Sequence, residues 1–512
     1  MATALLLTHH TGPVELKRVT SSPTKYLFAG AIMKRLAIAA LLFLLPLSAQ
    51  ASKVKPFYVR DQQYRFSDSD KRCSEGVLVG TKREKLCSSE PNHGLGDRDF
   101  SLNFVEFSDK GTPFDKTQLP AALAQLRDAG AKNTGRKTIV FIYIHGWHNG
   151  ADERPQGDSA DCGEHLYDGD VAKFRNCGLK VIAEYYPSSS SGTPRVVGIY
   201  LAWHGTDFGW PPLSYVPSYP IRRGFARSVG LNGMAQALQS IFSTIQTNRD
   251  SYFVIAMGHS FGARVLEAAD ESVSPDHPYA GIMKKVRLHT ESLAYNEDND
   301  EKLPVDLIFY VNAATSHFIS RRTIADWKTA CKDDPSTAGC GPRPLYLAVS
   351  SRADVLTAIV MPIANVAFFW FPTDRYHIIS AANTPWMQTH SIPRKVAAPK
   401  PLSENAFCFT IPNPPAQPDL YEVEPKQGSK QSIFWDMNTD HWDASFLEIL
   451  HVIPGLRQLT IHHWIISSHG DVWNTGVFNM VRAVIETERT RADGKEVTCG
   501  QDTKNQMPVL KN

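Results

Sequence analysis

The chain has 512 residues, and its 54 Lys and Arg residues against 52 Asp and Glu residues give a formal net charge of +2. With 42% hydrophobic and 10% aromatic residues, the chain can bury a large core, which excludes global disorder. The near-neutral charge argues against a nucleic-acid-binding protein, because such proteins usually carry a clearly basic domain or stripe.

Residues 33–51 have the composition of a secretory signal peptide. Met33-Lys-Arg35 forms a short basic head, residues 36–48 form an apolar run, and Ala49-Gln-Ala51 is a small-x-small cleavage site. We expect Met33 to be the true start and residues 1–32 to be a misassigned extension, so that 1–51 is a leader and the mature chain starts near Ser52. The alternative is an uncleaved membrane anchor. The sequence thus predicts an exported protein, periplasmic or secreted, with no stable membrane span in its mature part.

The exported part differs from the whole chain in charge and holds all the cysteines. Residues 1–51 contain five basic residues and one acidic residue, so the remaining 461 residues carry a formal net charge of −2. Eight cysteines in an oxidising compartment favour disulfides. Proximity in sequence suggests the following pairs, out of 105 possible connectivities: 73–87, 162–177, 331–340 and, by elimination, 408–499.

Strand and helix patterns alternate along the chain from residue 98 onward. Residues 98–108 alternate apolar and polar side chains and predict a half-buried strand, whereas residues 138–144 form a continuous β-branched and aromatic run that predicts a strand buried on both faces. Further strands are expected at 196–203, 252–257, 307–311, 345–349 and 459–466, and helices at 120–129, 223–248, 262–273 and 475–489. The alternation predicts an α/β fold with a mostly parallel central sheet flanked by helices.

Three segments depart from this alternation. Residues 52–96 are irregular, 373–455 are rich in Pro, Ser, Asn and Gln, and 491–512 form a C-terminal tail. A structureless loop as long as 373–455 is uncommon in a compact domain, so we expect an insertion with local structure, at the sheet edge or over the active site as a cap. It interrupts a main domain of residues 97–490.

A Gly-x-Ser-x-Gly motif, Gly258-His259-Ser260-Phe261-Gly262, lies between a predicted buried strand and a predicted helix. In this context it predicts a nucleophile elbow, in which a strained turn exposes the serine hydroxyl above the sheet. The alternative is an ordinary turn serine.

A serine nucleophile of this kind needs an oxyanion hole. The strand ending at Ile144 runs into His145-Gly146-Trp147, so we assign the two donors as the backbone N–H groups of Phe261 and Trp147. We expect His145 to hold the loop rather than to carry protons.

These motifs together make the chain resemble the α/β-hydrolase superfamily, closest to serine esterases and lipases. The resemblance is carried by Tyr143–Trp147, Gly258–Gly262, Ser350–Asp354 and Ser467–Asp471. It implies a catalytic triad in the chain order Ser, acid, His.

The resemblance places the acid and the base after late strands. Asp354 follows the strand 345–349 and would orient the imidazole, with Asp374 as the alternative and a surface pair with Arg352 as the non-catalytic interpretation. His469 follows the strand 459–466 and would be the base, with His441 and His463 as alternatives.

Other patterns favour structural roles. The apolar segment 355–372 predicts a buried helix broken at Pro362 or, alternatively, an acyl pocket or a lipid contact. An acidic cluster (Asp436, Asp440, His441 and Asp443) predicts a solvated turn rather than a cation site. His462 and His463 point to opposite faces of their predicted strand, and no cofactor or metal motif occurs.

The sequence therefore predicts an exported serine hydrolase that cleaves carboxylic esters, acts on a small-molecule or lipid ester and needs no cofactor. Lipase, amidase and peptidase activities would use the same triad, and a catalytically silent scaffold that binds partners is the alternative from another class.

Overall fold

The structure of the chain is a computed structural model, and it describes the following residues: 100–132, 137–147, 149–150, 170–185, 196–203, 205, 215–271, 304–315, 346–351, 354, 357, 361–368, 406–411, 419–425, 434–439, 473 and 475–492, with the two-residue strands at 78–79, 82–83, 390–391, 400–401 and 498–499. The chain divides into two units, Met1–Gln50 and Ala51–Asn512. The first unit, which contains most of the predicted leader, lies outside the described residues. All that follows concerns the second unit.

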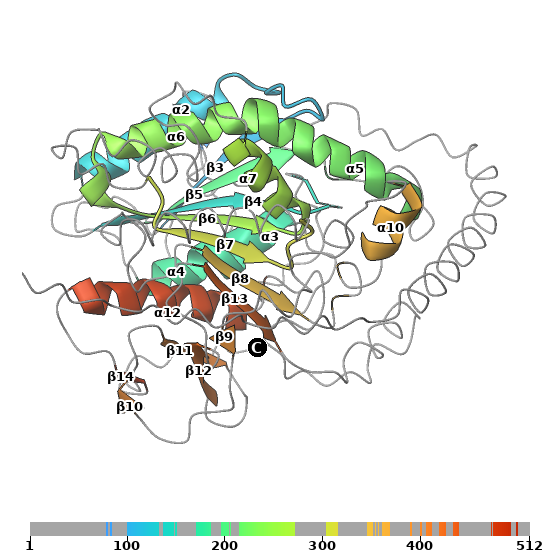
Figure 1. Cartoon of the computed structure of the whole chain (residues 1–512). Coiled ribbons are helices and arrows are strands. Elements are labelled where there is room, and N and C mark those ends of the chain that lie inside the picture. The colour runs from blue at the N-terminus through green and yellow to red at the C-terminus, as the bar shows by residue number, and fades with distance from the viewer. Residues whose placement is uncertain are drawn as a thin grey trace, which may run out of the picture. The chain divides into compact units, whose positions relative to one another are not determined.

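Seven strands form one sheet in the order β13-β8-β7-β6-β4-β5-β3, and each neighbouring pair is parallel. Figure 1 shows the twisted sheet between its helices. The strands are β3 (Phe100–Phe107), β4 (Thr138–Ile144), β5 (Val196–Trp203), β6 (Tyr252–His259), β7 (Leu307–Val311), β8 (Tyr346–Ser351) and β13 (Phe434–Thr439). The prediction of an α/β fold with a mostly parallel sheet is confirmed.

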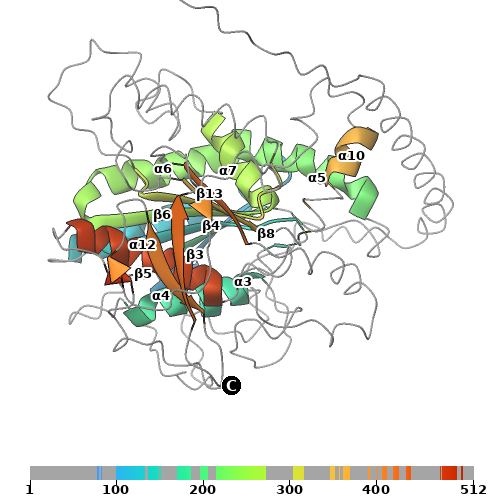
Figure 2. The same cartoon turned by 60° about the horizontal axis from the view of Figure 1, so that its bottom comes forward.

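The sheet is buried on both faces because helices cover each of them. Alternate residues of β4 belong to different cores: Val140, Ile142 and Ile144 to one, and Ile139, Phe141 and Tyr143 to the other. The first core contains α2 (Gln118–Lys132), α5 (Tyr215–Val229), α6 (Ala235–Gln246) and α7 (Phe261–Glu271). The second contains α3 (Asp170–Lys173), the π-helical η1 (Phe174–Leu179), α4 (Lys180–Tyr185) and α12 (Thr475–Ala492). The result is a three-layer sandwich, with the two helical layers on opposite sides of the sheet in Figure 2.

The predicted helix 223–248 is interrupted. The structure has α5, a π-helical segment η2 (Gly230–Met234) and α6, and Asn232 leaves helical geometry with φ −110° and ψ −108°. Gly233 packs directly on the backbone of Gly111, in the loop after β3, where a side chain at 233 would collide with the Gly111 carbonyl. The tertiary contact therefore overrides the helical periodicity at this point.

The expectation that the first strand is half-buried is wrong, since all eight residues of β3 are buried. Two of its polar side chains make hydrogen bonds inside. Asn103 Nδ2 donates to Gly198 O at 3.2 Å, and Gln118 Nε2 donates to Glu106 Oε2 at 2.6 Å. Both faces of β3 are thus buried, and each carries a polar side chain among apolar ones: Asn103 on the face of Val105 and Phe107, and Glu106 on the face of Leu102 and Phe104.

The predicted insertion 373–455 contains part of the main sheet. Its strand β13 pairs in parallel with β8 and extends the sheet at its edge, one of the two positions expected for this segment. The other strands of this segment belong to smaller antiparallel sheets. One consists of β11 (Phe407–Ile411), β12 (Asp419–Pro425) and β9 (His390–Ser391), and in the other β10 (Lys400–Pro401) pairs with β14 (Thr498–Cys499) of the predicted tail. A further antiparallel pair, β1 (Leu78–Val79) with β2 (Lys82–Arg83), lies in the predicted irregular segment 52–96.

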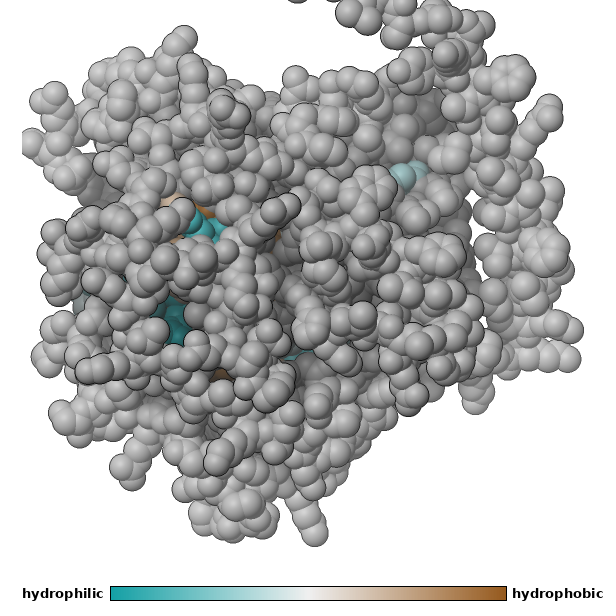
Figure 3. Space-filling view, turned by 90° about the horizontal axis from the view of Figure 1, so that it is seen from below, coloured by the Kyte–Doolittle hydropathy of each residue, from teal (hydrophilic) through white to brown (hydrophobic). Residues whose placement is uncertain are grey.

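The apolar segment 355–372 contains α10 (Met361–Phe368), and Met361 and Ala364 are buried in the first core. This confirms a buried helix there, with Pro362 as its second residue rather than at a break. No helix in the described part of the chain is long and apolar enough to cross a membrane. In the space-filling view of Figure 3, the described residues reach the surface only in a few small areas, some hydrophilic and some hydrophobic. The predicted strand 459–466 lies outside the described residues.

Candidate active site

Ser260 lies at the turn between β6 and α7, in the predicted strand–turn–helix arrangement. Its φ of 54° is a left-handed conformation that is uncommon for a residue with a side chain. The two motif glycines are required by contact: a Cβ at Gly258 would lie 2.6 Å from Ala263 Cα, and a Cβ at Gly262 would meet the carbonyl oxygen of Ile144. The turn is therefore a tight elbow.

Backbone hydrogen bonds fix this elbow to the next strand of the sheet. Ser260 N–H donates to Val311 O at the end of β7, and Ala314 N–H donates back to Ser260 O, both at 3.1 Å. Ser260 is 2% exposed, so it is enclosed and not open above the sheet as the motif predicted. The difference arises because neighbouring backbone closes around it, and exclusion of water strengthens electrostatic interactions at such a position.

The predicted oxyanion loop lies against Ser260. A Cβ at Gly146 would lie 2.8 Å from Ser260 Cβ, so only glycine allows this approach. Trp147 follows directly, and its ring lies 5.8 Å from that of Phe261, centroid to centroid. Phe261 is the first residue of α7, where amide N–H groups have no intrahelical acceptor. Both predicted donors therefore belong to backbone that adjoins Ser260.

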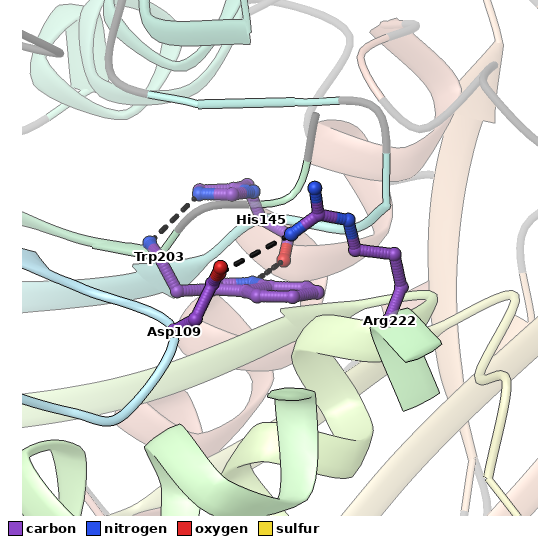
Figure 4. A network of polar contacts seen from close by, with 4 residues as sticks. All are labelled: Asp109, His145, Trp203 and Arg222. Atoms are coloured by element: carbon purple, nitrogen blue, oxygen red, sulfur yellow. Dashed lines mark hydrogen bonds and ion pairs between the residues drawn. The ribbon is translucent and has the colours of Figure 1, made fainter. Parts of the chain in front are cut away.

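His145 is fully buried, and both of its ring nitrogens are engaged. Nε2 accepts the backbone N–H of Trp203 at 3.0 Å, and Nδ1 lies 2.8 Å from Gly146 O. Because a backbone N–H can only donate, the imidazole proton is on Nδ1 and is donated to Gly146 O. The Trp203 indole N–H donates to His145 O at 2.9 Å (Figure 4). His145 holds the loop, as the sequence suggested.

Asp354 lies three residues beyond β8 and is fully buried. It accepts hydrogen bonds from Thr357, with the backbone N–H 3.1 Å from Oδ1 and the hydroxyl 2.5 Å from Oδ2. Asn312 N–H, at the end of β7, donates to Val349 O in β8 at 3.0 Å. The ends of β6, β7 and β8 are thus joined, and Asp354 follows at the same edge of the sheet as Ser260. The alternative acid, Asp374, lies outside the described residues.

His469 lies outside the described residues, as do His441 and His463. Trp473, four residues after His469, is described: its ring packs edge-on against Tyr143 at 4.7 Å. Tyr143 pairs with Met257 of β6, two residues before the end of that strand. Trp473, the described residue nearest to His469 in the sequence, therefore packs against β4, the strand beside the one that ends at the elbow. His441 is the second residue after β13, the strand beyond β8, and it stays an alternative, as does His463.

A buried polar cluster on the α3 side was not predicted. Asp170, 6% exposed, accepts hydrogen bonds from Tyr143 OH at 2.9 Å, Tyr200 OH at 3.0 Å and Trp473 Nε1 at 2.6 Å. Burial, together with the negative charge of Asp170, raises the pKa of Tyr143 well above its ordinary value. The partners are up to 303 residues apart, so no local pattern could have revealed them.

A second unpredicted cluster adjoins the oxyanion donors on the α5 side. The Tyr219 ring lies 6.0 Å from that of Trp147 and 5.4 Å from that of Phe261. Tyr219 OH and Arg223 Nη1 both donate to Asn365 Oδ1 in α10, at 3.2 and 3.0 Å. Burial raises the pKa of Tyr219 to about 12.

Arg264 completes this second cluster from one turn inside α7. Its Nε donates to Arg223 O at 3.3 Å, and it is 8% exposed. Burial, and then the neighbouring charge of Arg223, lowers the pKa of Arg264 to about 10.

No protein-family model, curated protein or solved structure matches the chain. Within the described residues, no cluster of His, Cys, Asp and Glu side chains could hold a metal ion. The arrangement of the described residues is therefore what defines the site: a strained serine, adjoining backbone donors and a buried acid at one edge of a parallel sheet.

Proposed function

We propose that the chain is an exported serine hydrolase of the α/β-hydrolase type that cleaves carboxylic esters through an acyl-enzyme intermediate. The observation that carries this proposal is Ser260, held at φ 54° with the backbone of Gly146 against its side chain. A non-glycine residue in a strained conformation, enclosed by glycines that admit no side chain, is typical of a functional turn. An ordinary turn serine would not need such neighbours.

The proposed chemistry uses these groups in sequence. A histidine base takes the Ser260 proton as Oγ attacks the ester carbonyl, while Asp354 orients the imidazole. The developing oxyanion is stabilised by the N–H groups of Phe261 and Trp147. The alcohol leaves with the proton from the imidazole, and water, activated by the same base, releases the acid. No cofactor takes part in these steps.

The nucleophile is tested by fluorophosphonate labelling of the purified protein and by turnover of nitrophenyl esters. Wild-type protein should be labelled at Ser260, and Ser260→Ala should lose labelling and at least about 10⁴-fold in kcat while keeping its thermal unfolding midpoint. Ser101→Ala, which removes a fully buried serine of β3, is the control and should keep its activity. Near-normal ester turnover by Ser260→Ala would rule out the assignment.

The base is tested by a matched pair of variants, His469→Ala and His441→Ala. Trp473, four residues after His469, packs against Tyr143 of β4, which supports His469 as the base. His469→Ala should therefore lose activity to the level of Ser260→Ala, and His441→Ala should keep most of it. The opposite result would assign the base to the loop after β13. A series of nitrophenyl esters of increasing acyl length, together with an anilide, then distinguishes esterase, lipase and amidase activity, and absence of both labelling and turnover would favour a binding scaffold.

A further inference from the structure

Trp203, the last residue of β5, and Gly205 lie against the predicted oxyanion loop. A Cβ at Gly205 would lie 2.6 Å from Asn149 O and 2.8 Å from Gly146 O. Gly205 N–H donates to Trp203 O at 2.8 Å, which closes a tight turn. Gly146 is therefore in close contact with both Ser260 and Gly205.

Trp203 binds His145 at two points. The backbone N–H of Trp203 donates to Nε2, and its indole N–H donates to the backbone carbonyl of His145. The two rings are stacked, with an interplanar angle of 3° and a centroid distance of 5.7 Å. Trp203 is 1% exposed, so water does not compete for these bonds. Trp203 therefore fixes the orientation of His145 by two hydrogen bonds and a stacked ring, and Tyr200 of the same strand stacks on the imidazole at 5.6 Å.

The orientation of His145 in turn determines that of the next peptide. Its Nδ1–H donates to Gly146 O, and this oxygen belongs to the same planar peptide group as the N–H of Trp147. In a trans peptide the C=O and N–H bonds point in opposite directions. Fixing Gly146 O therefore fixes the direction of the Trp147 N–H, the donor assigned to the oxyanion.

A charged pair lies beside this arrangement. Figure 4 shows Arg222 reaching from α5 toward His145 and Trp203, and its Nη1 lies 3.2 Å from Asp109 Oδ1. Asp109 comes from the loop after β3, and the Arg222 side chain is fully buried. The ion pair thus joins α5 to the loop after β3.

We propose that Trp203 and Gly205 are positioning residues that aim the Trp147 N–H at the oxyanion of the reaction. This inference rests on the proposed function, and it goes beyond it by assigning a catalytic consequence to residues that touch no substrate. An oxyanion donor acts only when it is aimed in advance at the position where charge develops. Loosening Trp203 or displacing Gly146 should therefore weaken binding of the transition state more than binding of the substrate.

The first test compares two variants that each remove one buried aromatic donor. Trp203→Phe removes the bond to His145 O, and Tyr252→Phe removes a bond of the same 2.9 Å length, from Tyr252 OH to Leu126 O, at the opposite end of β6. Both should lower the thermal unfolding midpoint. Only Trp203→Phe should lower kcat, by about 10- to 100-fold with little change in KM. The same variant should weaken the binding of phenylboronic acid, which forms a tetrahedral adduct with the serine, by a similar factor.

The second test uses glycine-to-alanine variants, which stay informative if Trp203→Phe fails to fold. Gly205→Ala should lower kcat because its methyl group pushes on the oxyanion loop. Gly224→Ala, at an exposed position of α5 with no atom within 4 Å of the added carbon, should keep kcat.

The outcomes separate this inference from the proposed function. If wild-type protein is not labelled at Ser260, the proposed function fails and the inference falls with it. If wild-type protein is labelled, but each test variant matches its control in kcat and in boronic acid affinity, the inference alone is wrong, and Trp203 and Gly205 serve stability only.

Discussion

A charged side chain is buried on each face of the sheet, and the two side chains differ in how many hydrogen bonds they receive or make. On the α3 side, the Asp170 carboxylate receives three hydrogen bonds from Tyr143, Tyr200 and Trp473. On the α5 side, the Arg264 guanidinium makes one hydrogen bond, to Arg223 O, and its Nη1 has no partner among the described residues.

The difference shows which cluster contributes to stability. A buried charge with complete hydrogen bonding fixes the groups around it, so Asp170 joins β4, β5 and the segment before α12 into one unit. A buried cation with few partners costs stability, and such costs are found most often beside functional sites. Arg264 lies one turn beyond Ser260, which fits that expectation.

The largest effect should follow loss of the carboxylate in Asp170→Ala. The Tyr143 hydroxyl and the Trp473 indole N–H would lose their acceptor, whereas the Tyr200 hydroxyl can still donate to Gly150 O at 2.8 Å. We expect the free energy of unfolding to fall by about 3–5 kcal/mol. Urea denaturation measures this change. Asp170→Asn keeps one acceptor oxygen and should cost about half as much or less. Equal losses for both variants would mean that the negative charge, and not the number of hydrogen bonds, stabilises the cluster.

A smaller effect should appear at alkaline pH in Tyr219→Phe. Because burial raises the pKa of Tyr219 from 10.0 to about 12, the native state keeps a proton that the unfolded chain releases. The stability that this group provides is complete below pH 10 and is lost as the pH rises toward 12. The stability advantage of wild-type protein over Tyr219→Phe should therefore shrink by about 2 kcal/mol between pH 9 and pH 12. Denaturant titrations at both pH values measure it, and a constant difference would contradict the raised pKa.

The smallest effect on the free energy of unfolding, and the only increase among the three, should come from Arg264→Met. Replacing an under-bonded buried cation with an apolar side chain should raise the free energy of unfolding by about 1 kcal/mol at pH 7. Because the pKa of Arg264 is lowered from 12.5 to about 10, this gain should hold below pH 10 and decrease above it. Arg227→Met, at an exposed position of α5, should change stability little. Clear destabilisation by Arg264→Met would show that the guanidinium has a strong partner in solution.

Much of the fold could be predicted from local sequence because the signals were continuous. The strands 138–144, 196–203 and 307–311 have the predicted bounds, since runs of β-branched and aromatic residues fit only a strand buried on both faces. The turn at Ser260 could be predicted because the flanking glycines are required by close contacts that leave no room for a side chain.

The features that were not predicted have a common physical cause: they depend on contacts between residues that are far apart in the sequence. The polar residues Asn103 and Glu106 made the strand look half-exposed, yet both are buried and hydrogen-bonded to Gly198 O and Gln118 Nε2. The break at Asn232 depends on Gly111, and Asp170 acquires its role from Trp473. Residues 170–185 were not predicted to be helical, and β13 was assigned to an insertion because its sequence is polar.

Cysteine pairing illustrates the same limit. The pairing of the eight cysteines stays a prediction. Spacing along the chain cannot choose among the possible pairs, since geometry in the folded protein decides.

The all-parallel order of the sheet also has a consequence for how the chain reaches this state. Phe100 pairs with Val196 and Phe434 with Tyr346, so each edge of the sheet forms only after a long stretch of chain has been made and brought back. Such pairings fold slowly, because the entropy of closing a long loop is lost before any contact compensates for it. Until β3 and β13 dock, apolar strands beside them are open to other chains. The yield of folded protein during synthesis should therefore depend on how quickly β3 and β13 pair with β5 and β8.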